Sequence, residues 1–333
     1  MHLSRKQGVF FIGGIGISAV FLWLAIKQVD IKTTVEILKG TNYLYFFPVF
    51  LFGCLDFFFR SLRWRALLLP LKKCSIFNIF SIFAISTFAT TVLPMRLGEL
   101  VKIVFLSEKE SISKIGVAGS VVMERVFDLL VIFLFLTITV SVFGLLGDFR
   151  KFWNYGFMLF LVPFSGMLCL VFIGEKAASA IEKYIAVLSK KAAVKAGRIM
   201  RSFLIVFEGI KNVRIFIIVC FLSLTVWSLN SSVFYFMAKS VGITELTYPG
   251  AVFIMVITCL GIALPSSPGF IGVFEYFGVI ASGALGIDKN RALGFILLLH
   301  SVQIFSVVVI GLFFLAREQL SILKLQEKLS VQE

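Results

Sequence analysis

Ten charged residues lie inside or beside strongly apolar segments of this 333-residue sequence. A charged side chain within a bilayer costs about 2.5–3.5 kcal/mol on insertion scales, so such residues usually face a cavity or a partner. Their side chains can form ion pairs, transfer protons and bind phosphate. The residues are Asp56, Arg60, Arg63, Arg96, Glu99, Lys102, Glu124, Arg125, Asp128 and Glu275.

The spacing of the first group predicts a pair on a helix. Asp56 and Arg60 are four residues apart, and Arg63 and Trp64 follow them. One interpretation is that these side chains anchor the helix at the membrane interface, as long basic side chains and tryptophan often do. The alternative is a role in binding or moving a substrate.

Two further groups also have helical spacing. Arg96, Glu99 and Lys102 follow one another at intervals of three and share a face if that segment is helical. Glu124 and Asp128 also share a helix face, with Arg125 between them in the sequence. Arg125 and Asp128 are separated by three residues and can pair. These groups indicate either a buried ion-pair network that fixes helix packing, or a hydrophilic path along which a lipid headgroup or a proton crosses.

The apolar regions 77–107 and 248–286 are each broken by Pro and Gly, and both contain the pattern L-P-x-x-x-G. Broken helices in corresponding positions of two halves are typical of transporter binding sites. Glu275 follows the second break, where Pro, Ser and Gly leave backbone groups free to bind a ligand. The alternative is chance recurrence of a short pattern. His300, within the last apolar segment, is either proton-sensitive or part of an interhelical hydrogen bond.

The composition identifies a membrane protein, with 59% apolar and 15% charged residues and a mean hydropathy of +1.01. Segments long enough to span a bilayer lie at 8–26, 43–59, 117–146, 153–173, 214–238 and 292–316. The first of these is interpreted as a retained signal-anchor. Nucleotide-binding and hydrolase motifs are absent from the sequence, and its five cysteines have no metal-ligand spacing, so no cofactor or metal is expected.

The distribution of Lys and Arg predicts the topology. Basic residues are concentrated at the N-terminus, at 60–73, at 109–114, at 176–214 and after 317, and are sparse in the other short segments. Because basic loops stay on the cytoplasmic side, both termini are predicted to be cytoplasmic, in the cell membrane. The formal charge of +14 then reflects topology and contact with anionic lipids rather than nucleic-acid binding.

The predicted fold class is an all-α polytopic membrane protein with six full spans and two re-entrant helical hairpins. The chain is predicted to form one transmembrane domain of two inverted repeat halves, residues 1–150 and 151–333, with a basic cytoplasmic segment at 175–213. That segment is either a helix on the membrane surface or a solvated linker helix. Eight or more full spans are the alternative.

Four motifs resemble the lysylphosphatidylglycerol synthase transmembrane (flippase-like) family, which includes the flippase domain of the multiple peptide resistance factor. They are R-x-x-R-W at 60–64, L-P-x-R-x-G-E at 93–99, E-R-x-x-D at 124–128 and P-x-x-P-G-x-x-G-x-x-E at 265–275. The resemblance implies lipid translocation through these charged residues. The sequence departs from the family pattern at Thr91, at Lys102 and near His300, and the soluble synthase domain is absent.

The leading hypothesis is therefore a non-enzymatic translocator of a phospholipid or lipid-linked intermediate. Its expected partners are anionic phospholipids or polyprenyl phosphates. Arg96 and Arg125 would contact phosphate, while Glu99, Glu124 and Asp128 would hold the arginines or relay protons. The alternative is a non-catalytic subunit that assists a membrane glycosyltransferase or lipid-modifying enzyme. The sequence does not indicate an oligomeric state.

Overall fold

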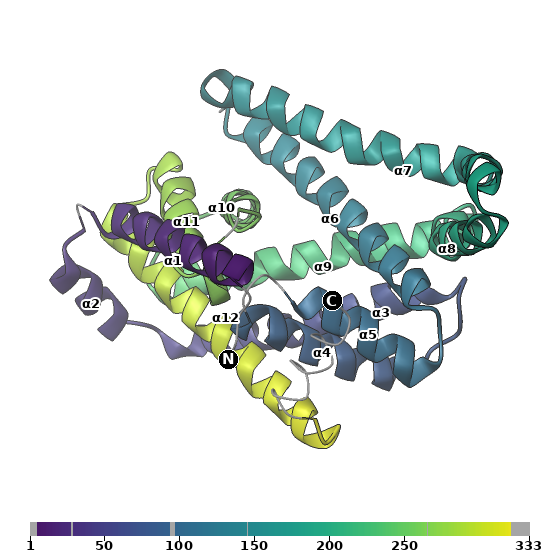
Figure 1. Cartoon of the computed structure of the whole chain (residues 1–333). Coiled ribbons are helices and arrows are strands. Elements are labelled where there is room, and N and C mark those ends of the chain that lie inside the picture. Colours follow the sequence, from purple (N-terminus) through teal and green to yellow (C-terminus); the bar gives the residue numbers. More distant parts are fainter. Residues whose placement is uncertain (1–4, 28, 94–96, 145, 265, 321–333) are drawn as a thin grey trace.

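The computed structural model describes residues 5–27, 29–93, 97–144, 146–264 and 266–320. Within these ranges every regular element is helical, with no β-strand (Figure 1). Arg96, Pro94 and Pro265 lie outside the described residues. The elements, in which η marks a 3₁₀ helix, are α1 Arg5–Ile26, α2 Ile31–Lys39, η1 Tyr43–Tyr45, α3 Phe46–Leu68, α4 Ile76–Val92, α5 Gly98–Glu110, α6 Lys114–Val142, α7 Leu146–Leu188, α8 Lys190–Gly209, α9 Val213–Ser240, α10 Tyr248–Gly261, η3 Pro268–Phe270, α11 Val273–Ala284 and α12 Lys289–Arg317.

Long apolar helices confirm the multi-pass membrane class. In the described part of the chain, four stretches are long and apolar enough to cross a membrane, namely Tyr43–Leu68, Lys114–Val142, Val213–Ser240 and Lys289–Arg317. The predicted spans 8–26 and 153–173 lie within α1 and α7. Shorter apolar helices lie in the two broken regions, at Ile76–Val92, Tyr248–Gly261 and Pro268–Ala284. The number of full crossings stays a prediction.

The first broken region folds into two helices, α4 and α5, that return to the same end of the bundle. Glu110, the last residue of α5, accepts hydrogen bonds from the Ser75 amide at 3.3 Å and from Asn78 Nδ2 at 2.8 Å at the start of α4. Gly98 permits close contact at the other end of the pair, since a Cβ there would lie 2.1 Å from the Ser86 carbonyl oxygen. The region is therefore a helical hairpin, and its depth in the bilayer stays a prediction.

The second broken region forms a similar hairpin from α10 and α11. A Cβ on Gly250, near the start of α10, would lie 3.2 Å from Leu285, which follows α11. The connection between the two helices contains η3 and reaches α4, where a Cβ on Gly269 would lie 3.8 Å from the Thr91 carbonyl oxygen. The tips of the two hairpins therefore meet.

The segments rich in Lys and Arg gather at one end of the bundle, which we call the base-rich end. Lys72 Nζ donates to the Glu110 carbonyl at 2.6 Å, and Lys109 pairs with Glu318 at 2.5 Å. Pro70 lies against Gly209, where a Cβ would come within 2.0 Å of the proline ring. The loop after α3 and the ends of α5, α8 and α12 thus share one side of the molecule, as the distribution of basic residues predicts.

The base-poor connections meet at the opposite end. The Asp30 amide donates to Asn290 Oδ1 at 2.8 Å, which joins the start of α2 to the start of α12. The Asn42 amide donates to the Ser240 carbonyl at 2.8 Å at the end of α9. The hairpin of α10 and α11 returns to this end, whereas that of α4 and α5 returns to the base-rich end. Which end faces the cytoplasm stays a prediction.

The segment 175–213 is built by the end of α7 and by α8, which lie beside α6 at the periphery (Figure 1). Arg201 of α8 pairs with Glu175 at 2.9 Å and with Glu182 at 2.8 Å, both on α7. Leu204 and Phe207 of α8 are buried inside the protein. The 43 residues of α7 extend over about 65 Å, roughly twice the thickness of a hydrocarbon core, so α7 is longer than one crossing requires.

Candidate functional site

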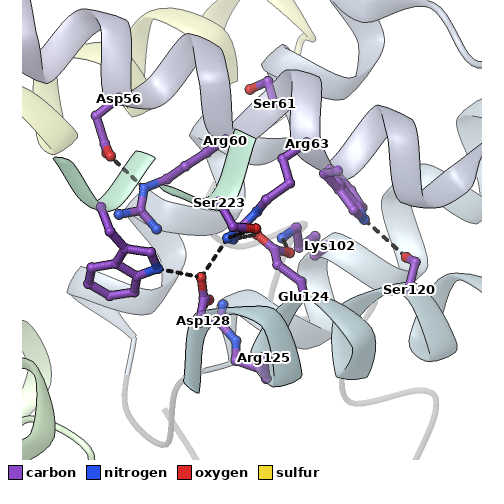
Figure 2. A network of polar contacts seen from close by, with 12 residues as sticks. Asp56, Arg60, Ser61, Arg63, Lys102, Ser120, Glu124, Arg125, Asp128 and Ser223 are labelled. Carbon is purple, nitrogen blue, oxygen red and sulfur yellow. Dashed lines mark hydrogen bonds and ion pairs between the residues drawn. The ribbon is translucent and has the colours of Figure 1, made fainter. Parts of the chain in front are cut away.

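Arg63 is fully buried on α3 and binds two carboxylates of α6 (Figure 2). Its Nη1 donates to Asp128 Oδ1 at 2.7 Å and to Ser223 Oγ of α9 at 3.3 Å, and its Nη2 donates to Glu124 Oε1 at 3.1 Å. The planar guanidinium stays charged and suits such forked contacts. The interpretation of Arg63 as an interfacial anchor is therefore wrong, because its charge is held inside the bundle.

Glu124 is engaged through its second oxygen as well. Lys102 of α5, which is 1% exposed, pairs with Glu124 Oε2. The Lys102 ammonium lies 4.4 Å from the ring centroid of Trp64 and 5.1 Å from that of Phe83, so aromatic faces stabilise the buried cation. Trp64 is held in place by a 3.0 Å hydrogen bond to Ser120 Oγ.

Asp128 connects the buried network to a more exposed arginine. Its Oδ1 also accepts a hydrogen bond from Trp227 Nε1 at 3.0 Å, and its Oδ2 accepts one from Arg125 Nη1 at 3.1 Å. Arg125 Nη2 donates to Glu99 Oε1 of α5 at 2.5 Å. The Arg125 side chain is half exposed. The pair between Arg125 and Asp128 is the one that their spacing predicts.

Asp56 and Arg60 also form their predicted pair, with 2.7 Å between Arg60 Nε and Asp56 Oδ2. The Arg60 guanidinium lies 5.2 Å from the Trp227 ring centroid. Asp56 is 7% exposed, and its Oδ1 has no hydrogen-bond partner among the described residues. The same holds for Glu99 Oε2. Buried unpaired carboxylate oxygens are rare in native proteins, so each of these two is available to a donor from a ligand.

The cluster holds equal numbers of acids and bases and lies deep in the bundle. Counted at about 1.5 Å per residue, Arg60 lies about 12 Å along α3 from Leu68, and Glu124 lies about 15 Å along α6 from Lys114. Both helix ends belong to the base-rich side. In a hydrocarbon core of about 30 Å, these residues would lie close to the midplane. The acids are Asp56, Glu99, Glu124 and Asp128, and the bases are Arg60, Arg63, Lys102 and Arg125.

A cavity of about 510 Å³ adjoins this cluster. The α4 helix contributes hydroxyl groups, and α9 and α12 contribute the amides of Asn230 and Gln303. Arg63 and Asp128 do not line the cavity, but they contact Glu124 and Arg125, which do. The charged residues that line the cavity are Asp56, Arg60, Glu99, Lys102, Glu124 and Arg125.

The remaining wall of the cavity is apolar and reaches the outer surface of the bundle. On α3 it contains Phe50, Gly53 and Cys54, and on α12 it contains Phe305 and Val309. Phe50 is 43% exposed, Phe305 64% and Val309 49%. Because both helices present exposed apolar side chains at this rim, the cavity faces the lipid between α3 and α12. Its floor is charged and its mouth is apolar.

Glu275 does not reach this cavity. Its carboxylate contacts His300 and the backbone of Gly272, and it is absent from the cavity lining that the other described site residues form or support. Sequence reasoning also missed Trp227 and Ser223, which contact Asp128 and Arg63. A single tryptophan or serine in an apolar span carries no signal of such a contact. Arg96 lies outside the described residues.

In the described residues, no group of three His, Cys, Asp or Glu side chains could hold a metal ion. A family model described as "Lysylphosphatidylglycerol synthase TM region" matches residues 11–311, almost the whole chain. The match is to the membrane region of that synthase and not to its catalytic domain. No curated protein and no solved structure matches the chain.

Proposed function

Since the chain belongs to the lysylphosphatidylglycerol synthase TM region family, we propose that it moves an amphiphilic lipid between the leaflets of the membrane. The observation that carries this proposal is the cavity of about 510 Å³ with a charged floor and an exposed apolar mouth. A phospholipid or a polyprenyl phosphate has the matching two-part chemistry. Its headgroup would occupy the floor while its hydrocarbon chains stay in the bilayer.

The basic residues of the floor would bind the lipid phosphate. Arg125 is half exposed and has donors left over from its pairs with Glu99 and Asp128. Arg60 and Lys102 line the same space. The unpaired oxygens of Asp56 and Glu99 would accept hydrogen bonds from headgroup hydroxyl or ammonium groups. A ligand with both an anionic group and donors would thus satisfy the site.

The two helical hairpins would act as gates. They return to opposite ends of the bundle, and their tips meet at Gly269 and Thr91, beside the cavity residue Thr90. This arrangement supports an inverted pair of halves with alternating access. The base-rich end would face the cytoplasm, and the lipid would cross without any covalent change, so the chain would act as a transporter in the cell membrane.

Reconstituted vesicles provide the test. Labelled anionic phospholipids and polyprenyl phosphates are placed in one leaflet, and their appearance in the other is followed with and without the protein. We expect faster exchange for at least one lipid class and a loss of that rate in Arg125→Gln. Arg214→Gln, at the exposed start of α9, is the matched control. Equal rates with and without protein for every lipid would refute the proposal.

A second candidate is a subunit that docks a separately encoded lipid-modifying enzyme or glycosyltransferase. It is favoured by the end of α7, where Tyr184 is 79% and Val187 84% exposed. Co-purification of such an enzyme, lost in Tyr184→Ser with Val187→Ser, would support it. Unchanged enzyme activity after neutralising the basic residues of 190–201 would count against it.

A further inference from the structure

Glu275 and His300 form a buried ionisable pair away from the charged cavity. His300 Nδ1 lies 2.6 Å from Glu275 Oε1, and the two residues are 5% and 3% exposed. Glu275 Oε2 accepts the Gly272 amide at 2.6 Å. The His300 ring stacks on Phe274, with 4.1 Å between centroids and 14° between planes. Both oxygens of the carboxylate are therefore engaged, one with the hairpin backbone and one with α12.

Within the described part of the chain, the elements around this pair carry few other ionisable groups. By sequence, α4 and η3 have none, while α10 and α11 add only neutral tyrosine and cysteine side chains. In α1, α9 and α12 the charged residues stand at the helix ends, and α2 lies in a connection at the base-poor end. The groups concerned are Tyr248, Cys259 and Tyr276; Arg5 and Lys6; Arg214 and Lys239; Lys289, Arg291 and Arg317; and Lys32, Glu36 and Lys39.

The net charge of the pair depends on the number of protons that it binds. A carboxylate beside a neutral imidazole carries one negative charge, and an uncompensated charge in an apolar interior is strongly unfavourable. One added proton on the imidazole makes the pair neutral overall. Protonation of both groups would again leave a net charge. The pair therefore has no net charge when it holds one proton.

We infer that Glu275 and His300 form a proton-binding site that couples lipid movement to proton transfer. The proton is held on the His300 imidazole against the Glu275 carboxylate while the α10–α11 hairpin is closed. When the hairpin opens and water reaches the pair, the imidazolium releases its proton to water and the pair becomes singly negative. A proton taken up from either side restores the closed state. This inference rests on the proposed function.

The contacts of the pair provide the mechanical link. Glu275 holds Gly272 in the connection whose tip contacts Thr91, and His300 is one helical turn from Gln303 in the cavity wall. Loss of the 2.6 Å contact would remove the hydrogen bond that joins the hairpin to α12. The same proton would thus control a gate and one wall of the headgroup cavity.

The protonation state can be measured without any transport. The sequence has two histidines, His2 and His300, so His2→Gln leaves one imidazole for nitrogen NMR with labelled histidine. In the intact pair we expect an imidazolium signal at pH 7. In Glu275→Gln, whose amide can still accept from Gly272, the imidazole should become neutral at that pH. A neutral His300 in the intact pair would overturn the inference.

Coupling is then tested in vesicles with and without a pH difference across the membrane. In the native chain, the lipid exchange rate with the pH difference should differ several-fold from the rate without it, so that their ratio is far from one. It should return to one in Glu275→Gln and in His300→Gln. Thr258→Val, a buried hydroxyl deletion on α10, should keep the native ratio.

The possible failures are distinguishable. Lipid exchange that ignores the pH difference overturns the coupling and leaves the proposed function intact. An imidazolium at pH 7 without any lipid exchange refutes the proposed function and, with it, the coupling, although the proton site itself would stand. If Glu275→Gln fails to fold, the native chain still carries the NMR measurement, and His300→Gln, which can still donate to Glu275, carries the coupling measurement.

Discussion

Arg63 and Asp128 are joined by a 2.7 Å hydrogen bond that links α3 to α6 inside the bundle. Arg63 shares Asp128 with Trp227 and with Arg125, the half-exposed base at the cavity. A buried cation thereby positions the carboxylate that holds the candidate phosphate-binding arginine. The same contacts would thus hold α3 and α6 together and fix the position of Arg125.

Replacement of Arg63 by methionine should strongly destabilise the protein. The substitution leaves Glu124 and Asp128 buried with one cation fewer, and removal of one partner from a buried ion pair costs about 3–5 kcal/mol. Thermal unfolding in detergent measures the loss. Arg214→Met removes an equal charge from an exposed position and should have little effect. Equal melting temperatures for the two variants would contradict a stabilising role for the Arg63 contacts.

Local spacing could predict part of this site. The pair of Asp56 and Arg60 and the pair of Arg125 and Asp128 follow from helical periodicity alone. The partners of Arg63 could not be predicted, because they lie on other helices whose rotation depends on packing. For the same reason the sequence does not reveal that Glu275 contacts His300 rather than the central charges.

The fold was predictable to a similar extent. Hydropathy located the long apolar helices, and Pro and Gly located the breaks between α4 and α5 and between α10 and α11. The contact between the hairpin tips depends on Gly269 and Thr91, which are far apart in the sequence. No local pattern specifies that contact.

Gly53→Trp should block the mouth of the cavity without unfolding the protein. Gly53 lies on the α3 wall, and a Cβ added there would meet no atom within 4 Å. The indole would occupy the space through which the lipid chains pass, so the lipid exchange rate should fall at least about tenfold, a barrier increase of about 1.4 kcal/mol. Gly166→Trp, on α7 and equally unobstructed, is the control. Native exchange in Gly53→Trp would exclude a route between α3 and α12.

Cys54 should report lipid binding at the same mouth. Its side chain is exposed and lines the cavity, while Cys169 is exposed on α7 away from it. A transported lipid added to the detergent-solubilised protein should slow maleimide labelling of Cys54 and leave Cys169 unaffected. Mass spectrometry of the two peptides measures both rates. Equal protection of both cysteines would indicate micelle effects rather than a bound lipid.

Glu318 should make stability depend on pH at the base-rich end. Partial burial raises the pKa of Glu318, but hydrogen bonds from Lys109 and Ser81 and the nearby positive charges outweigh this and lower its pKa. A lowered folded-state pKa means that the contact stabilises fully above the unfolded value of about 4.3 and is lost as the pH falls through the folded value. The free energy of unfolding falls between pH 7 and pH 3, and this fall should be smaller in Glu318→Gln than in the native chain by up to about 1 kcal/mol. An identical pH dependence in both proteins would show that the contact is absent in solution.

Gly272→Ala should disrupt the contact between α1 and the second hairpin. Gly272 has a φ of +88°, and a Cβ there would lie 2.2 Å from the carbonyl oxygen of Ser18 on α1. Gly286→Ala is a matched control, since its φ is +78° and a Cβ would meet no atom within 4 Å. Both variants carry the backbone cost of about 1–2 kcal/mol, and only Gly272→Ala adds overpacking of about 1–3 kcal/mol. Unfolding in detergent should therefore separate the two variants, whereas equal losses would mean that α1 does not pack on Gly272.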